Sequence, residues 1–223
     1  MDFLSWPSEK ITAIPLGVSA QFAPASVTEL TSCLARHGLT FKRYALCVST
    51  LEPRKKIANL LQAYECLPAR VREQYPLVLV GSSGWLSNTL HATIERLAAQ
   101  GWLRYLGFVP EADLPALYAG AQAFVYPSIY EGFGLPVLEA MASGVPVVTS
   151  IFTSLPEVTQ GAARLVDPDD IDALALGIHT ALCDEAWRAT ACETGLEKAR
   201  NFTWSRCVGQ TIDVYRQVAA KSS

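Results

Sequence analysis

The sequence predicts an α/β fold: a doubly wound, mostly parallel, Rossmann-like sheet with helices on both faces, followed by C-terminal helices. Short apolar runs alternate along the chain with amphipathic segments of helical length. The apolar runs lack the polar alternation of a half-exposed strand, which is typical of parallel strands covered on both faces. A glycine-bearing loop joins one of these strands to a helix, and in such sheets ligands bind at the carboxyl ends of the strands.

Each element is predicted from its own local pattern. Apolar runs of strand length predict strands at 44–49, 77–81, 103–106, 121–126, 145–149 and 163–166. Segments with helical periodicity predict helices at 57–66, 88–100, 111–118, 135–142, 171–183, 185–201 and 205–220. Before them, a capping box formed by Ser26 and Glu29 opens a helix that ends at Gly38, and 11–18 is interpreted as a short strand.

Composition limits the classes of function. The chain has 223 residues, of which 50% are hydrophobic and 17% charged, and its formal net charge is −3. This composition is typical of a folded domain with a substantial core. The small net charge gives no indication that the protein binds nucleic acid. No apolar run reaches membrane-spanning length, and no signal-peptide pattern is present. The 6 cysteines are scattered, so we expect reduced thiols and a cytoplasmic protein.

The loop from Glu131 to Gly134 lies between a predicted strand and a predicted helix. A helix N-terminus presents free N–H groups and the positive end of the helix dipole, which together favour phosphate. Gly132 and Gly134 let a ligand approach the main chain. Glu131 and Glu139 would repel phosphate, so we expect them to accept hydrogen bonds from sugar hydroxyls instead. The loop therefore predicts a site for a nucleotide sugar.

A second loop, 52–56, carries the consecutive cations Arg54, Lys55 and Lys56 directly after a predicted strand. Cations at a strand-to-helix junction suit a diphosphate, and Arg54 can bind one bidentately. A solvated basic surface turn is the alternative, and spacing alone leaves both interpretations open. The expected position at the same sheet edge as Glu131 favours the diphosphate.

Other loops carry weaker signals. The loop 81–85 resembles a phosphate loop but lacks both the G-x-G-x-x-G spacing and the Walker lysine. Phe108 and Val109 follow a strand end, where they either bracket a nucleobase or pack on the core. The sequence shows no His, Cys or Asp cluster with metal-ligand spacing, so we expect no metal site. Nor do we expect a catalytic role for any of the histidines, His37, His91 and His179.

Two other functions remain open from the residues alone. The pair Glu131 and Glu139 would suit a glycosidase, with one carboxyl group as the acid and the other as nucleophile or base. A neutral polysaccharide, however, has no phosphate for the basic loop or the helix N-terminus to hold. A non-catalytic nucleotide-binding module is the third interpretation.

The run from 131 to 148, EGFGLPVLEAMASGVPVV, resembles the signature of the family 4 retaining glycosyltransferases, the glycosyl transferase group 1 proteins with a GT-B fold. Shorter stretches agree with it in the right order: IPLGV at 14–18, TLEPRK at 50–55, LGFV at 106–109 and DLPALY at 113–118. The resemblance implies two Rossmann-like domains that face a cleft, of which the C-terminal one binds the nucleotide sugar and the N-terminal one the acceptor. This chain resembles the C-terminal domain.

The resemblance divides the chain into three parts. Residues 1–22 would be an inter-domain linker with a first strand, and 23–202 would be the nucleotide-sugar-binding domain. The helix in 203–223 would cross toward an N-terminal acceptor domain that is not part of this chain, leaving apolar residues such as Trp204 and Tyr215 exposed. The chain alone would then bind donor but transfer poorly, if at all. The missing domain would be the part that associates peripherally with the inner face of a membrane.

The resemblance also implies roles for individual residues. Arg54 and Lys55 would neutralise the departing diphosphate, and Glu131 would hold the donor sugar as the third catalytic residue. Glu139 would bind the ribose hydroxyls, and Val109 would meet the base through its backbone. The phosphate and sugar would also be held by the loop residues Gly132, Phe133, Gly134 and Leu135.

These features predict the donor-binding domain of a hexosyltransferase. The expected reaction transfers a hexose, preferably mannose, from a nucleotide sugar to a glycan or lipid-linked acceptor in bacterial surface polysaccharide (lipopolysaccharide) assembly. A GDP-sugar is the preferred donor by resemblance, with a UDP- or TDP-sugar as the alternatives, and no metal or other cofactor is expected. Many relatives carry Gly-Arg at the position of Ser49 and Thr50, so one phosphate contact would be missing or replaced here.

Overall fold

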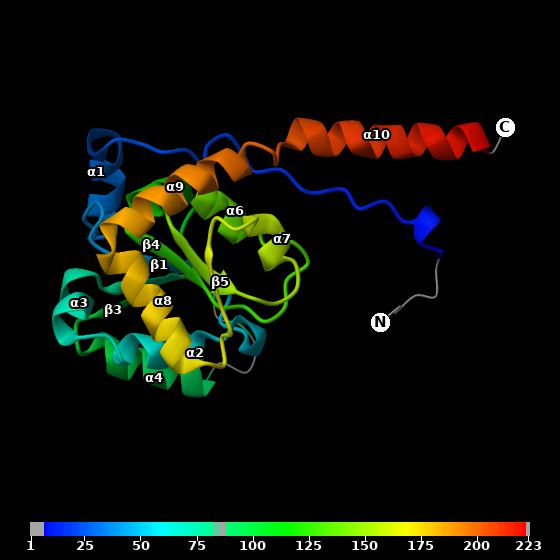
Figure 1. The fold of residues 1–223 in the computed structure, drawn as a ribbon. Helices are drawn as coiled ribbons and strands as arrows, with labels where there is room; N and C mark the ends of the chain where they lie inside the picture. The colour runs from blue at the N-terminus through cyan, green and yellow to red at the C-terminus, as the bar shows by residue number, and fades with distance from the viewer. Residues whose placement is uncertain (1–6, 83, 85–87, 222–223) are drawn as a thin grey trace.

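A single parallel sheet forms the centre of the computed structural model, which describes residues 7–82, 84 and 88–221. Its strands lie in the order β3-β2-β1-β4-β5-β6, and every neighbouring pair is parallel (Figure 1). The strands are β1 (Ala45–Val48), β2 (Leu77–Val80), β3 (Leu103–Gly107), β4 (Ala123–Tyr126), β5 (Val147–Ser150) and β6 (Arg164–Val166). This order confirms the predicted doubly wound, Rossmann-like fold.

Helices cover both faces of the sheet (Figure 1). They are α1 (Val27–Arg36), α2 (Ile57–Glu65), α3 (Ala69–Gln74), α4 (Asn88–Ala98), α5 (Leu114–Gly120), α6 (Leu135–Ala142), α7 (Leu155–Thr159), α8 (Ile171–Cys183), α9 (Glu185–Ala199) and α10 (Trp204–Lys221). The described residues also form three short 3-10 helices, η1 (Ser8–Lys10), η2 (Pro53–Lys55) and η3 (Glu111–Asp113). One apolar layer packs α1, α5, α6 and α7 on one face, and a second packs α2, α3, α4 and α8 on the other.

The two layers share the strands because successive side chains of a strand point to opposite faces. Leu46 of β1 and Phe124 of β4 enter the layer that contains α6. Their neighbours Cys47 and Val125 enter the layer that contains α8. β1, β2 and β4 are therefore apolar at every position, as the sequence pattern predicted for strands covered on both sides.

The predicted strand at 11–18 is wrong. This segment is extended, and within it the structure describes a single β-bridge, from Val18 to Thr203. The run is short and interrupted by Pro15, and it is not one of the strands that pair in the described sheet. The short helices α3 and α7 were not predicted, because elements this short carry too little periodicity to be recognised.

The segment before the domain meets the start of α10. The Val18 N–H donates to the Phe202 carbonyl at 3.0 Å. A Cβ atom on Gly17 would lie 2.1 Å from the backbone nitrogen of Trp204, so this approach requires glycine. Beyond this contact α10 projects away from the domain, and so does the segment N-terminal to Gly17 (Figure 1). The division of the chain at 22 and 202 remains a prediction.

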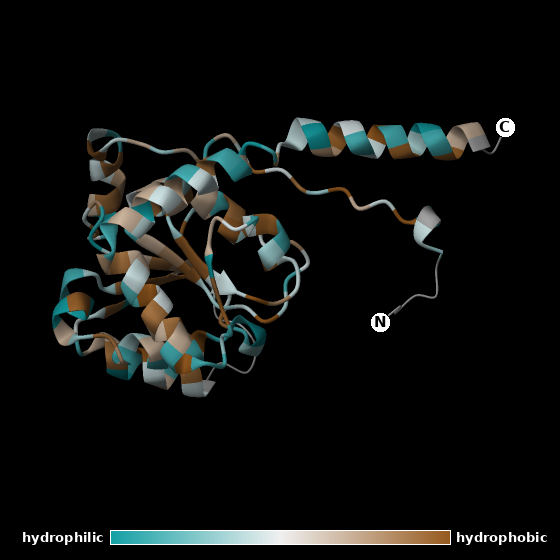
Figure 2. Ribbon diagram, in the orientation of Figure 1, coloured by the Kyte–Doolittle hydropathy of each residue, from teal (hydrophilic) through white to brown (hydrophobic). Residues whose placement is uncertain are grey.

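Helix α10 carries a row of exposed apolar side chains. Brown segments recur along its length in Figure 2. The large apolar residues that are exposed on it are Trp204, Val208, Ile212, Tyr215 and Val218. Their spacing of three or four residues places them along one side of the helix. Among the described residues, none of the helices has the length and apolar character needed to traverse a bilayer.

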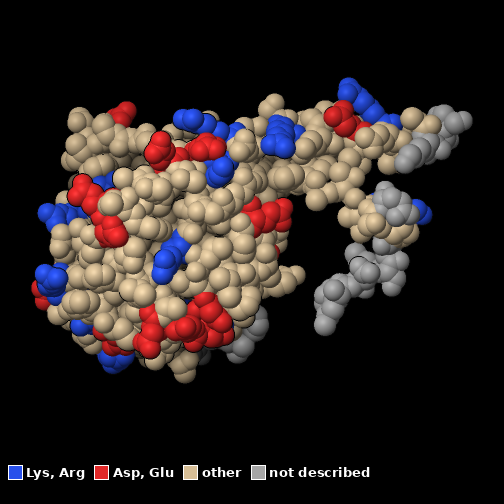
Figure 3. Space-filling view, in the orientation of Figure 1, with Lys and Arg blue, Asp and Glu red and all other residues tan. Residues whose placement is uncertain are grey.

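Charged side chains of both signs are mixed over the face of the molecule drawn in Figure 3. That face shows no broad basic surface of the kind that tracks a nucleic-acid backbone. This distribution agrees with the formal net charge of −3.

Candidate functional site: a basic crevice beside an acidic cavity

The predicted site residues Arg54, Lys55 and Glu131 lie in the loops that follow β1 and β4. These two strands are neighbours at the point where the strand order reverses. At such a switch point the chain leaves the sheet toward opposite faces, and a crevice opens between the two connections. The loops are joined there by a hydrogen bond from the Ile129 N–H to the Arg54 carbonyl at 2.9 Å. The predicted residues therefore share the position where this fold binds ligands.

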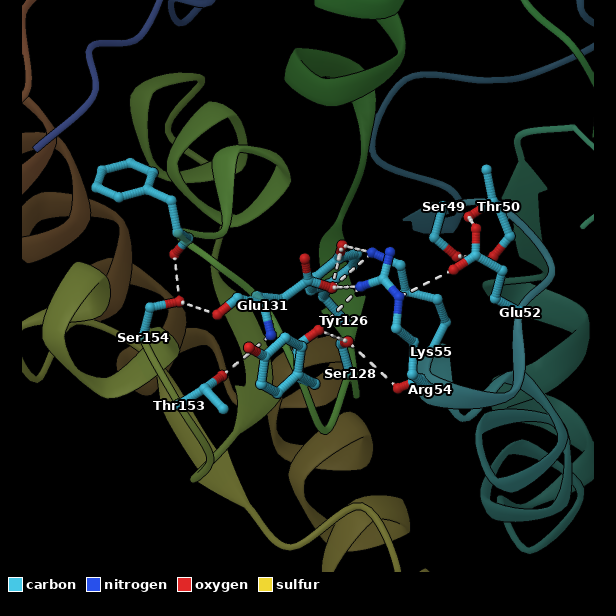
Figure 4. A network of polar contacts seen from close by, with 12 residues as sticks. Ser49, Thr50, Glu52, Arg54, Lys55, Tyr126, Ser128, Glu131, Thr153 and Ser154 are labelled. Carbon is cyan, nitrogen blue, oxygen red and sulfur yellow. Dashed lines mark hydrogen bonds and ion pairs between the residues drawn. The ribbon is translucent and has the colours of Figure 1, made fainter. Parts of the chain in front are cut away.

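The Glu131 carboxylate contacts both cations (Figure 4). Its Oε1 atom lies 2.5 Å from Nζ of Lys55 and 3.1 Å from Nη1 of Arg54. The same oxygen accepts a hydrogen bond from the Tyr126 hydroxyl at 2.9 Å. Arg54 is also paired with Glu52 at 2.9 Å. A single oxygen atom thus holds two basic groups together at the switch point, and we call this site of Arg54, Lys55 and Glu131 the basic crevice.

Lys55 is the more deeply placed cation, with a side chain 7% exposed against 40% for Arg54. Its ammonium group also lies 4.8 Å from the centroid of the Tyr126 ring, a favourable cation–π distance. Burial acts to raise the pKa of Glu131, but the hydrogen bond and charge of Lys55, together with neighbouring hydroxyl groups, outweigh it and lower that pKa. Glu131 is therefore ionised at neutral pH.

The glycine loop supplies unpaired backbone donors. Gly134 caps α6 with a φ of 105°, a backbone conformation that favours glycine. The Ser154 hydroxyl lies 3.1 Å from the Glu131 carbonyl oxygen and 2.8 Å from that of Phe133, which fixes the loop. In the described part of the chain, nothing accepts a hydrogen bond from the N–H groups of 132–135. They remain available to an anion at the N-terminus of α6.

Glu139 and Val109 line a separate hollow of about 540 Å³. Its other lining residues are Gly17, Val18, Ser19, Gln21, Phe22, Phe108, Glu111, Leu114, Leu135 and Trp204. Leu135 is also the last residue of the unpaired amide loop, and Glu139 lies about one turn further along α6. The hollow, which we call the α6 cavity, therefore adjoins the basic crevice through the first turn of one helix.

Glu139 has an unusual protonation equilibrium. Burial raises its pKa to about 7, and the nearby charge of Glu111 adds to the effect. The nearby Tyr118 hydroxyl acts in the opposite direction and lowers the pKa of Glu139 in part. This buried hydroxyl nevertheless forms no hydrogen bond of ordinary geometry with a described residue. Hydroxyl groups that donate to Glu139 would favour its ionised form.

Several details of the site differ from the sequence pattern. Lys56 was expected to contribute with its two neighbours, but it pairs with Asp169 at 2.7 Å and leaves the loop with two cations for the crevice. The hydroxyl of Thr50 donates to Glu52 at 2.8 Å. In the loop 81–85, Ser83 and Trp85 lie outside the described residues. The roles assigned to individual site residues remain predictions.

Tyr126 and Ser154 were missed by sequence reasoning. Tyr126 ends β4, and its position at the carboxyl end of a strand beside the switch point was the signal that could have identified it. Ser154 precedes α7, a helix that was itself not predicted, so no pattern placed it beside the loop.

Cys33, His37 and Asp113 lie close together in the structure, with their potential ligand atoms within 4.8 Å of one another. Their spacing in the sequence gave no sign of this. The Asp113 carboxylate there contacts Arg36 at 2.6 Å and His37 at 2.9 Å. These contacts join α1 to the start of α5. The expectation that the protein needs no metal ion stays a prediction.

The chain can be placed among known proteins. Residues 36–200 match the family model described as glycosyl transferases group 1. The chain belongs to this family. It is 48% identical over 212 residues to O-antigen chain mannosyltransferase B of Escherichia coli, a match that covers 95% of this chain and 56% of that protein. It is 32% identical over 225 residues to MMP alpha-(1->4)-mannosyltransferase of Mycolicibacterium hassiacum, covering 99% of this chain and 51% of that protein. The chain thus spans about half the length of these relatives.

Solved structures with similar folds confirm the architecture. HepE of Anabaena in complex with UDP is 25% identical with a TM-score of 0.79, covering 92% of this chain and 57% of that one. Sucrose-phosphate synthase from Thermosynechococcus elongatus is 29% identical with a TM-score of 0.77, covering 93% and 52%. The chain has the fold of one domain of a GT-B glycosyltransferase, as the resemblance implied. Because the family is one of transferases, the glycosidase interpretation of Glu131 and Glu139 no longer holds.

Proposed function

We propose that this chain is the donor-binding domain of a retaining glycosyltransferase. It would transfer a hexose, preferably mannose, from a nucleoside diphosphate sugar to a glycan or lipid-linked acceptor in bacterial O-antigen assembly. The observation that carries the proposal is the meeting of Arg54, Lys55 and the free amides of 132–135 at the switch point of the sheet. The names of its relatives, among them an O-antigen chain mannosyltransferase, support the choice of sugar and pathway.

The chemistry follows from where charge develops. Breaking the bond between the sugar and its phosphate builds negative charge on the departing diphosphate. Preorganised cations and backbone donors stabilise that charge most in the transition state, and loss of one such group costs about 10²-fold or more in rate. We propose that Arg54 and Lys55, with the helix-terminal amides, supply this stabilisation without a metal ion.

Glu131 would have two tasks in this arrangement. Its Oε1 atom holds Lys55, Arg54 and the Tyr126 hydroxyl in place. The second oxygen, Oε2, would accept a hydrogen bond from a hydroxyl of the donor sugar. Glu139, one turn into α6, would bind the ribose hydroxyls from the α6 cavity. The sugar and the ribose would thus flank the diphosphate on either side of the same helix terminus.

The remaining half of the enzyme would supply the acceptor site. The chain spans 56% of its Escherichia coli relative, which leaves room for a second domain there. The exposed apolar row on α10 is the surface that we expect such a domain to cover. A further apolar hollow of about 620 Å³ lies between the segment at Val18, α9 and the start of α10, and belongs to the same region.

Calorimetric titration of the chain tests the proposal. We expect binding of GDP and GDP-mannose, and none of a mannose oligosaccharide that lacks phosphate. Binding of the oligosaccharide alone would overturn the proposal. When the chain is combined with a matching acceptor half, sugar transfer should appear. Nucleotide binding with no transfer in that assembly would favour a non-catalytic nucleotide-binding module instead.

A further inference from the structure

Three potential metal ligands lie between α1 and the start of α5. Cys33 belongs to α1, His37 is the C-terminal cap of that helix, and Asp113 ends η3. Their potential ligand atoms lie within 4.8 Å of one another. None of these three described residues lines the α6 cavity or belongs to the basic crevice. The function proposed above therefore gives the cluster no role.

The fold holds the three side chains in place from two elements. Cys33 and His37 are four residues apart, which puts them on the same side of α1. Helix α1 packs on α5, and Leu34 and Leu117 of these helices belong to the same apolar layer. Asp113 is the N-cap residue of α5, where an aspartate ordinarily accepts a hydrogen bond from its own helix. Its side chain forms no such bond here, and its carboxylate contacts α1 and its cap instead.

The Asp113 carboxylate is arranged as a ligand that binds through one oxygen. Oδ1 lies 2.6 Å from Nη2 of Arg36, and Oδ2 lies 2.9 Å from Nε2 of His37. A metal ion between Oδ2 and Nε2 would open this 2.9 Å separation to about 3.3 Å, the span of two bonds of about 2.0 Å at a tetrahedral angle. Arg36 would keep Oδ1, as outer hydrogen bonds commonly hold ligating carboxylates.

The three donor atoms together select the class of metal. A thiolate, an imidazole nitrogen and a carboxylate oxygen are all ligands of Zn²⁺, which is usually bound by four ligands in a tetrahedron. Mg²⁺ and Ca²⁺ prefer oxygen ligands, so the sulfur and nitrogen disfavour them. Cys33 would release its thiol proton to solvent as the bond from sulfur to zinc forms. The thiolate and carboxylate then balance the charge of the ion, and a water molecule would be the fourth ligand.

We propose that Cys33, His37 and Asp113 form a zinc-binding site that ties α1 to the start of α5. The unfolded chain does not hold the three ligands together, so the bound ion would stabilise the folded chain. The proposal departs from the expectation, drawn from sequence spacing, that the chain has no metal site. It leaves the diphosphate chemistry of the basic crevice independent of a metal ion.

Titration of the whole chain with Co²⁺ tests the proposal. Co²⁺ can replace Zn²⁺ in such sites, and its bond to a thiolate gives a charge-transfer absorption band. We expect a band that saturates at one Co²⁺ per chain and disappears when Zn²⁺ is added. Cys33→Ser should lose the band. Asp113→Asn should weaken Co²⁺ binding about tenfold or more, since loss of even an outer partner of a ligand costs at least that much.

A matched control and a measurement on the unaltered chain complete the test. Cys66→Ser removes an exposed thiol at the end of α2 and should leave the band unchanged. In the wild-type chain, Zn²⁺ should slow the alkylation of Cys33 by iodoacetamide, as mapped by mass spectrometry, while Cys66 reacts as before. Zn²⁺ should also raise the urea midpoint of the wild type and leave that of Cys33→Ser unchanged.

Two results would overturn the proposal. Either Co²⁺ gives no thiolate band and Zn²⁺ leaves Cys33 unprotected in the wild type, or the band persists in Cys33→Ser. The contacts of Asp113 would then serve only to join α1 to α5. The protection measurement needs no variant, so a variant that fails to fold does not weaken the test. Because the cluster lies outside the donor site, either result leaves the proposed function standing.

Discussion

Removing the charge of Glu131 tests the linked cations most directly. In Glu131→Gln, the Lys55 ammonium would lose its anionic partner while only 7% of its side chain is exposed. Removing one member of a buried ion pair costs about 3–5 kcal/mol, because the other charge is left uncompensated. The glutamine keeps an acceptor oxygen, and the partly exposed Arg54 retains Glu52, so we expect the lower end, about 3 kcal/mol.

Urea unfolding of a double-mutant cycle measures this coupling. The cycle compares the wild-type chain with Glu131→Gln, Lys55→Met and the double variant. In the Lys55→Met background the buried ammonium is absent, so Glu131→Gln should cost about 1 kcal/mol or less. If Glu131→Gln costs under about 0.5 kcal/mol in both backgrounds, the ion pair is not formed in solution and the reasoning is refuted.

The pH dependence of the same cycle has a definite sign. The folded-state pKa of Glu131 is lowered from its ordinary value of 4.5. Its contribution to stability is therefore fully present above pH 4.5 and is lost as the pH falls through the folded-state pKa. The difference in unfolding free energy between wild type and Glu131→Gln should shrink over that acidic range. A difference that grows on acidification would contradict the assignment.

Two further predictions concern α6. Because the folded-state pKa of Glu139 is raised from 4.5 to about 7, the wild-type chain should lose stability as the pH rises through that window. The loss amounts to about 3 kcal/mol of unfolding free energy, and Glu139→Gln should lack it. If urea unfolding gives the same pH dependence of stability for the wild type and Glu139→Gln, this prediction is contradicted. Gly134→Ala should destabilise the chain by about 1–3 kcal/mol, since its φ is 105° and the added Cβ would lie 2.7 Å from the Leu155 side chain. Gly132→Ala, with nothing within 4 Å, is the matched control, and equal unfolding midpoints for the two would refute this reasoning.

Much of the fold followed from the sequence because its signals are local. The runs around Leu46 and Phe124 are apolar at every position, which only a sheet covered on both faces explains. The segment at 11–18 misled the same reasoning, because an apolar run forms a strand only where a partner strand is available. That condition depends on the whole fold, and within this described segment the structure has an isolated bridge from Val18 to Thr203 instead of a strand.

The site could be predicted in outline for a topological reason. Loops after parallel strands meet at one edge, so Arg54, Lys55 and Glu131 could be expected together. The direction of each side chain could not, since it depends on contacts distant in sequence. Lys56 turns to Asp169, more than a hundred positions away along the chain. Glu111 likewise looks like an ordinary surface acid until the fold places it at the rim of the α6 cavity.

The affinity of GDP relative to guanosine, in wild type and in Arg54→Ala, tests the central claim that the basic crevice binds a diphosphate. A hydrogen-bonded charge contributes about 1.5–3 kcal/mol, so Arg54→Ala should weaken GDP binding about 10- to 100-fold in calorimetric titration. Guanosine, which has no phosphate, should bind both forms equally, and Arg70→Ala, at an exposed arginine on α3, should change neither. GDP binding that is unaffected by Arg54→Ala, or no tighter than that of guanosine, would contradict the account.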